Sequence, residues 1–142
     1  MSARSTAEQF LRATVGDDPG DLADSYADEV VIEMPFAPAG LHPSRIATTR
    51  EELRTRFRAG ASLRRYDRVT NIRVHETTDP RVVVVEYDLH GHMVASGEDF
   101  TLSFAMVMTV EDGRIVHTRD YADPLAGARA LGRLPELLDA LR

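Results

Sequence analysis

Asp120 is the first residue whose type and position could support chemistry. If residues 116–122 form a strand, Val116, Thr118, Asp120 and Ala122 fall on one of its faces. If that face lines an apolar hollow, burial raises the pKa of the carboxyl and makes it a usable general acid or base. In the alternative, Asp120 caps the next segment or pairs with Arg119 at the strand end.

A second candidate is a row of polar residues on the stretch 82–92. Glu86 and Asp88 stand two residues apart on one strand face, which His90 and His92 continue. Two neighbouring carboxylates can share a proton and work as an acid–base pair. The opposite face is equally suited to point inward, which would leave both acids in solvent. It carries Val83, Val85, Tyr87 and Leu89.

Two missing residue types narrow the chemistry. The chain has no cysteine, and all 17 of its basic residues are arginine. Thiolate nucleophiles, lysine Schiff bases and a phosphate-loop lysine are therefore excluded. The five histidines do not form a ligand set that we would assign to a metal. We expect neither a metal nor another cofactor.

Length and composition indicate one globular domain spanning residues 1–142. Hydrophobic residues make up 43% and charged residues 28% of the chain. The net charge of −6 argues against nucleic acid as the main ligand. No apolar run is long enough to cross a membrane, and the first residues do not read as a signal peptide. A cytoplasmic location is expected.

Hydrophobic periodicity predicts helices first and strands later. Capping boxes at Ser5–Glu8 and Thr49–Glu52 start two helices, and Asp17-Asp18-Pro19 starts a short one between them. The predicted strands are Val30–Phe36, Val69–Thr77, Arg81–His92, Phe100–Val110 and Ile115–Tyr121, with a loop over Pro35–Thr48 and short helical turns at Ala126–Leu131 and Glu136–Leu141.

This order predicts an α+β fold in which helices pack on one face of a curved antiparallel sheet. The strand 100–110 supports it, because one face carries large apolar residues such as Phe104 and Met106. Its other face carries small or β-branched residues such as Ala105 and Val107. An outer sheet face this apolar suggests a partner. We expect a homodimer through it.

Three segments resemble a known superfamily. The hairpin Asp112–Pro124 is similar to the ending common among SnoaL-like proteins, and segments 71–80 and 130–132 are similar to parts of PhzA/PhzB-like proteins. The chain thus resembles the SnoaL-like, ketosteroid-isomerase-like (nuclear transport factor 2-like) superfamily. The resemblance implies a cone-shaped α+β domain, in which three helices of the N-terminal half cover the concave face of the sheet around a pocket.

The resemblance also assigns roles, residue by residue. In limonene-epoxide-hydrolase-like members the aspartate that Asp120 matches is catalytic, and Asp88 matches a second aspartate. Glu86, however, stands where their arginine would be. Met34 occupies the position of the ketosteroid isomerase base, and no acid stands near Ala105 or Met106 where its second acid falls. Arg56 and Gly60 take the places of the PhzA/PhzB pocket histidine and serine.

The expected pocket is mostly apolar and is entered past the loop 35–43. Its implied lining residues are Tyr26, Met34, Phe36, Arg56, Phe57, Phe104 and Met106. Tyr26 or Arg56 would orient a ligand oxygen, and a hydrophobic small molecule is the expected ligand. The arginines at 50, 54 and 58 share a helix face that could capture a ligand anion or simply form surface ion pairs.

Two functions remain open from the sequence. The first is a cofactor-free enzyme that isomerises, cyclises, hydrates or dehydrates an oxygenated apolar metabolite, with Asp120 as acid or base, assisted by Asp88 or Glu86. The second is a non-catalytic ligand-binding or dimerisation module on the same fold.

Overall fold

The computed structural model describes residues 1–142. In chain order the elements are α1 (Ala3–Thr14), the 3-10 helix η1 (Pro19–Ser25), β1 (Tyr26–Glu33), β2 (Arg45–Thr49), α2 (Arg50–Gly60), β3 (Arg64–Glu76), β4 (Val82–Met93), β5 (Asp99–Glu111), β6 (Arg114–Ala122), α3 (Pro124–Ala130) and α4 (Leu134–Ala140).

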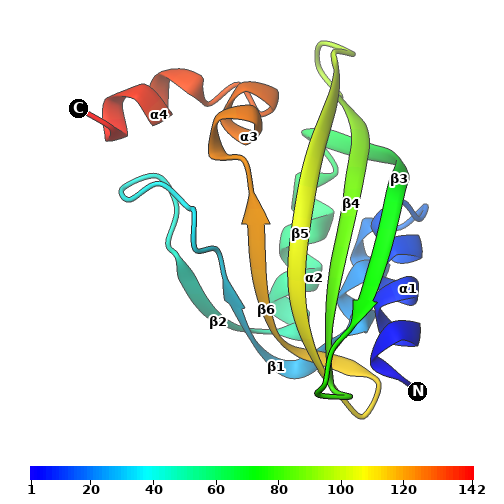
Figure 1. Cartoon of the computed structure of the whole chain (residues 1–142). Coiled ribbons are helices and arrows are strands. Elements are labelled where there is room, and N and C mark those ends of the chain that lie inside the picture. The colour runs from blue at the N-terminus through cyan, green and yellow to red at the C-terminus, as the bar shows by residue number, and fades with distance from the viewer.

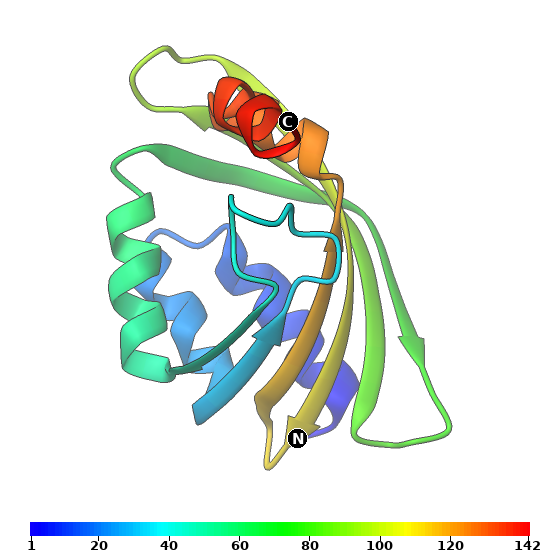
Figure 2. The same cartoon turned by 90° about the vertical axis from the view of Figure 1, so that its left-hand side faces the viewer.

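The strands form one strongly curved sheet in the order β2-β1-β6-β5-β4-β3 (Figures 1 and 2). The expectation of a purely antiparallel sheet is wrong in one place, because β1 pairs in parallel with β6. A parallel neighbour requires a crossover, and everything from β2 to β5 supplies it. This pairing brings Met34, just after β1, level with the end of β6.

The concave face of the sheet is covered by α1, η1 and α2, as expected (Figure 2). From α1, Ala7, Phe10 and Leu11 enter a core of 16 buried residues that also takes alternate residues of β4 and β5. The core occupies the narrow end of the cone. The opposite end is left to the functional cavity described below.

Arginines of α2 fasten this layer together. Arg54 donates to the Gly20 carbonyl at 2.8 Å and to the Asp24 carboxylate at 2.7 Å. Arg50 reaches the Tyr26 carbonyl at 2.9 Å. Arg58 pairs with Asp18 at 3.5 Å. The stripe at 50, 54 and 58 therefore contacts η1 and β1, and none of its three arginines lines the main cavity described below.

Several predicted boundaries needed correction. The first helix is capped by Ser2 rather than by Ser5, the second predicted helix is a 3-10 helix, and β2 lies inside the predicted loop. The cap at Thr49 is confirmed, because its side chain accepts from the Glu52 amide. The short edge strand β2 was missed because three prolines closely precede it and its five residues give little alternation.

A β-bulge at the start of β6 decides which residues face inward. Val110 pairs with Ile115, whereas Thr109 pairs with His117, so Val116 is an extra residue. Ile115 and Thr118 are consequently both buried. The predicted face therefore holds for Thr118, Asp120 and Ala122, while Ile115 takes the inward position that alternation would have given to Val116.

The wide end of the cone is walled by the loop 34–44 and by α3. Figure 1 shows the loop in cyan beside the orange and red C-terminal helices. Asp123 caps α3 by accepting from the amides of Leu125 and Ala126 at 2.9 and 3.3 Å. None of the helices has the length and apolar character needed to cross a bilayer.

Candidate active site

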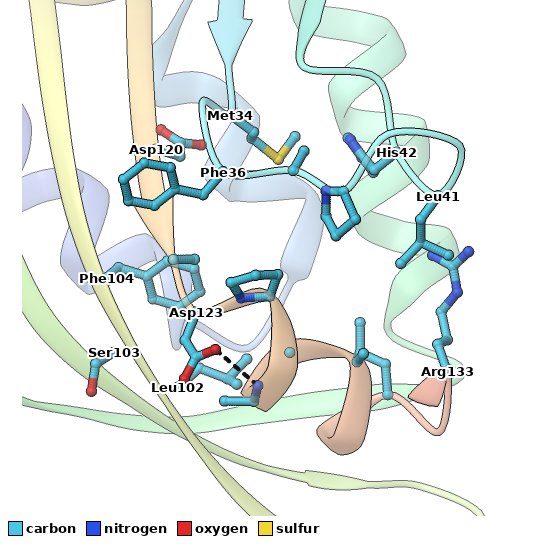
Figure 3. A pocket seen from close by; sticks show the side chains of 18 of the residues that line it. Met34, Phe36, Leu41, His42, Leu102, Ser103, Phe104, Asp120, Asp123 and Arg133 are labelled. Carbon is cyan, nitrogen blue, oxygen red and sulfur yellow. Dashed lines mark hydrogen bonds between the residues drawn. The ribbon is translucent and has the colours of Figure 1, made fainter. Parts of the chain in front are cut away.

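A cavity of about 370 Å³ lies at the wide end of the cone, between the loop 34–44, the inner face of the sheet and α3 (Figure 3). Its wall is largely apolar. The lining residues are Met34, Phe36, Ala37, Pro38, Leu41, His42, Arg64, Tyr66, Leu102, Ser103, Phe104, Asp120, Ala122, Asp123, Pro124, Ala126, Gly127, Ala128, Leu131 and Arg133.

Asp120 contributes a half-buried carboxyl to this wall. It lies opposite Met106 in the β5–β6 register, and Figure 3 shows it close to Met34 and Phe36. Its Oδ1 atom is buried and has no hydrogen-bond partner. Burial raises the pKa of Asp120 to about 6, against the smaller lowering effects of Thr118 and His117. A carboxyl with this pKa exchanges protons near neutral pH.

Two buried tyrosines lie close enough to Asp120 for its charge to affect their pKa values. Burial raises the pKa of Tyr26 and of Tyr87, and the charge of Asp120 adds to both shifts. The Tyr87 hydroxyl donates to the Met106 sulfur at 3.3 Å, and its ring stacks on Phe104 with centroids 5.3 Å apart. Asp120 therefore has tyrosines and a thioether nearby and no arginine partner, and His117 is the one cationic side chain that lowers its pKa.

The predicted lining residues separate into three groups. Met34, Phe36 and Phe104 line the cavity. Tyr26 and Met106 are buried in the core behind it. Arg56 and Phe57 line a smaller hollow of about 70 Å³ between α2 and η1. The implied role of Arg56 in the main pocket is therefore not supported by its position.

Glu86 and Asp88 do not join Asp120, which corrects the acid-pair hypothesis. Val85, Tyr87 and Leu89 are buried on the inner face of β4, so both acids lie on the outer face. The Oε2 atom of Glu86 lies 2.6 Å from the Nε2 atom of His75. Asp88 accepts from Ser103 at 2.7 Å and Asn71 at 2.6 Å, and these hydrogen bonds lower its pKa. The alternative face named from the sequence is the inner one.

The histidines of β4 share this outer face. His90 contacts Thr70 and Thr101, and His92 contacts Asp67 at 2.9 Å. No group of three or more histidine, aspartate or glutamate side chains is placed so that it could hold a metal ion.

Sequence reasoning missed part of the lining, above all Arg64, Tyr66 and the residues of α3. The strand predicted over Val69–Thr77 corresponds to β3, which begins five residues earlier, at Arg64. Arg64 and Tyr66 are two residues apart and thus share a strand face, which is a signal that alternation could have given. The Arg64 Nε donates to the Tyr66 hydroxyl at 3.0 Å.

A curved sheet with helices on its concave face, enclosing an apolar cavity with a half-buried carboxyl, defines a cone-shaped α+β domain of the ketosteroid-isomerase-like type. Residues 7–118 match the SnoaL-like domain, and the chain belongs to that family.

The chain is 30% identical over 141 residues to the PhzA/B-like protein PA3332 of Pseudomonas aeruginosa, covering 93% of this chain and 92% of that protein. A Bacillus subtilis structure proposed to be an isomerase superposes with a TM-score of 0.80 at 27% identity over 92% of this chain and 93% of that one. A Pseudomonas putida structure proposed to be a polyketide cyclase gives 0.75 at 14% identity, over 92% and 98%, which shows the shared fold.

Proposed function

We propose that the protein is a cofactor-free acid–base enzyme acting on an oxygenated, mostly apolar small molecule, with Asp120 as the proton-transferring residue. The observation that carries the proposal is the unpartnered Oδ1 of Asp120 in the wall of an apolar cavity, with the pKa raised to about 6 by burial. The Bacillus subtilis relative that is proposed to be an isomerase is consistent with this class of reaction.

In the proposed reaction the Asp120 carboxylate removes a proton from the carbon next to a carbonyl group. The C–H electron pair forms a new double bond to the carbonyl carbon, and the carbonyl π pair moves onto the oxygen, which gives an enolate. If the substrate has a β,γ double bond, this enolate is a conjugated dienolate. The protonated carboxyl then returns its proton to a different carbon of the conjugated system, and the double bond shifts. The proton that Asp120 removes is returned to the substrate, so the reaction consumes no co-reactant.

The surroundings of Asp120 suit a base that must recover its proton. Met34, Phe36 and Phe104 hold an apolar substrate and keep water away from the carboxyl. Because no arginine pairs with Asp120, its ionised form is not over-stabilised. A carboxylate held by an arginine would have a low pKa and would be a weak base.

Deuterium exchange tests the proposal directly. The probe is 2-tetralone, a bicyclic ketone with acidic α-hydrogens, in D2O, followed by proton NMR. The wild-type protein is expected to accelerate exchange above the buffer rate, and Asp120→Asn to remove at least about 99% of that acceleration. Asp88→Asn is the matched control, because it neutralises an aspartate on the outer face. Equal exchange in the wild type and Asp120→Asn contradicts the proposal.

A binding module is the competing function. Met34 and Met106 stand where the ketosteroid isomerase acids would fall, so the cavity holds fewer acids than that resemblance implies. If 2-tetralone binds equally well to the wild type and Asp120→Asn while neither accelerates exchange, the binding module is the correct interpretation.

We also propose that two copies of the chain associate through the outer sheet face. Val84 and Val107 are partners in the β4–β5 register, and both are only partly buried in the single chain. Val31 and Val116 extend this outer surface toward β1. A second copy would bury these β-branched residues, which a solvated sheet face seldom exposes together.

A further inference from the structure

We propose that Arg64 binds a carboxylate of the substrate, which makes the ligand of this cavity an apolar molecule that carries an acid group. The inference deepens the proposed function, and rests on it only in taking the 370 Å³ cavity as the substrate site.

The charged groups of the cavity wall differ in what they already contact. Asp123 is occupied as the cap of α3. Arg133 donates its Nε to Glu136 at 2.8 Å. The Nδ1 of His42 contacts the Pro43 carbonyl at 2.7 Å. Arg64 has no carboxylate within salt-bridge distance and makes one side-chain hydrogen bond, from its Nε to Tyr66. The terminal nitrogens of its guanidinium remain available.

The Arg64 side chain is held in place by its neighbours. Its side chain is tied to Tyr66, and the Tyr66 ring packs edge-on against Phe100 with centroids 6.2 Å apart. The guanidinium also lies beside Gly60 at the end of α2, since a β-carbon built there would be 3.5 Å from the Arg64 NH2. A guanidinium held in place loses little freedom when it forms a paired contact with a carboxylate.

Arg64 also separates two hollows, because it lines both the main cavity and the smaller one of about 70 Å³. The smaller hollow adds Arg56 and Arg65 but no acidic side chain. A protein with net charge −6 thus concentrates three arginines around the smaller hollow, and Arg64 is the one that also reaches the main cavity. Such a local excess of cations favours an anionic ligand group.

The cation and the proton-transferring acid are kept apart. Asp120 lies on β6 and Arg64 on β3, and the strands β5 and β4 lie between these two in the sheet. A substrate carboxylate at Arg64 would therefore avoid direct repulsion by Asp120. The carbon that loses its proton would lie toward Phe36 and Phe104, near the acid (Figure 3).

A matched pair of probes tests the inference by calorimetry. We expect 2-naphthoate to bind the wild-type protein at least about tenfold more tightly than the neutral 2-naphthamide, since hydrogen bonds between charged groups are the stronger ones. Arg64→Gln should remove this preference without weakening naphthamide. Arg68→Gln, which removes an exposed arginine of β3 outside the lining, should retain it. Arg64→Lys should keep part of the preference.

Three results would overturn the inference: equal affinity of the wild type for both probes, binding of neither probe, or equal losses of preference in Arg64→Gln and Arg68→Gln. The preference is measured without catalysis, and Asp120→Asn should preserve it. Failure of the exchange assay and failure of this binding assay are therefore separate outcomes.

Discussion

Asp120 and Met106 are register partners on β6 and β5, so the carboxyl has a thioether, and not a cation, as its cross-strand neighbour. The epoxide-hydrolase-like arrangement would have placed an arginine within reach of the acid. Here the residue matched to that arginine, Glu86, lies on the outer face with His75. The absence of a paired cation leaves burial as the dominant influence on Asp120.

The rate of the exchange reaction should therefore rise with pH. If Asp120 acts as the base, its ionised form is the active one, and the rate of 2-tetralone exchange should rise and level off above a midpoint near pH 6. The same midpoint should appear in the carboxyl carbon shift of Asp120 in an NMR titration. A midpoint close to 3.8, the ordinary value, would contradict the role.

Stability should change with pH through the same group. Well below pH 3.8, the ordinary pKa, the carboxyl is protonated in both folded and unfolded chains. As the pH rises from there to about 6, the unfolded chain ionises while the folded one keeps its proton, so stability falls and then levels off. This shift corresponds to about 3 kcal/mol at about 1.4 kcal/mol per pH unit.

Urea denaturation at pH 3.5 and 7.5 measures this effect. The free energy of unfolding of Asp120→Asn should increase relative to that of the wild type by about that amount between the lower and the higher pH, so the variant gains relative stability. Asp88→Asn supplies the contrast. The pKa of Asp88 is lowered in the fold by Ser103 and Asn71, so its removal should not reproduce a gain at high pH.

At Gly91 on β4, the neighbouring strands β3 and β5 leave no room for a side chain. This glycine lies between Tyr66 on β3 and Phe100 on β5, and a β-carbon there would be 2.4 Å from the Arg65 carbonyl and 2.7 Å from the Phe100 ring. Gly91→Ala should destabilise the fold by about 1–3 kcal/mol in urea denaturation. Gly127→Ala in α3, where nothing lies within 4 Å, should be neutral or stabilising by up to about 1 kcal/mol.

Phe36 should matter for binding more than for stability. Its side chain lines the cavity yet is 61% exposed, and its ring touches Tyr121 edge-on with centroids 5.3 Å apart. Phe36→Ala should weaken 2-tetralone binding by about fivefold, which corresponds to about 1 kcal/mol of lost apolar contact. Its urea midpoint should stay close to wild type. A large loss of stability with unchanged binding would show that Phe36 is structural.

A single charged substitution on the outer face tests the proposed self-association. Val107→Arg places a guanidinium among the outer valines and should convert the proposed dimer to a monomer in sedimentation equilibrium. Ser96→Arg, in the exposed turn between β4 and β5, is the matched control and should leave the association unchanged. A wild-type protein that sediments as a monomer at high concentration contradicts the proposal.

The sequence predicted the fold class, because the long alternating strands and the Asp112–Pro124 hairpin are strong local signals. The inward orientation of Asp120 was expected as well. The orientation of β4 could not be decided, since its two faces, Val85–Tyr87–Leu89 and Glu86–Asp88–His90, each have a plausible environment. Only the pairing with β3 and β5 decides between them.

The remaining lining residues could not be predicted from the sequence, because they depend on contacts between distant segments. Arg64 gains its place in the wall from the start of β3, and α3 closes the cavity from the far end of the chain. Local periodicity contains no information on which distant segments meet, so these lining residues required the three-dimensional arrangement.

The extra residue at Val116 has an evolutionary consequence. The bulge absorbs it: with Val116 deleted, Ile115 and His117 would follow each other in plain alternation opposite Val110 and Thr109, and Asp120 would still face inward. An insertion or deletion between Thr118 and Asp120 that no bulge absorbs would instead turn the carboxyl to the outer side of the sheet. A relative could thus gain or lose its acid within the cone through a single codon insertion or deletion, with the aspartate itself retained. Sequence alignments that ignore strand length at this hairpin would then group together proteins of different chemistry.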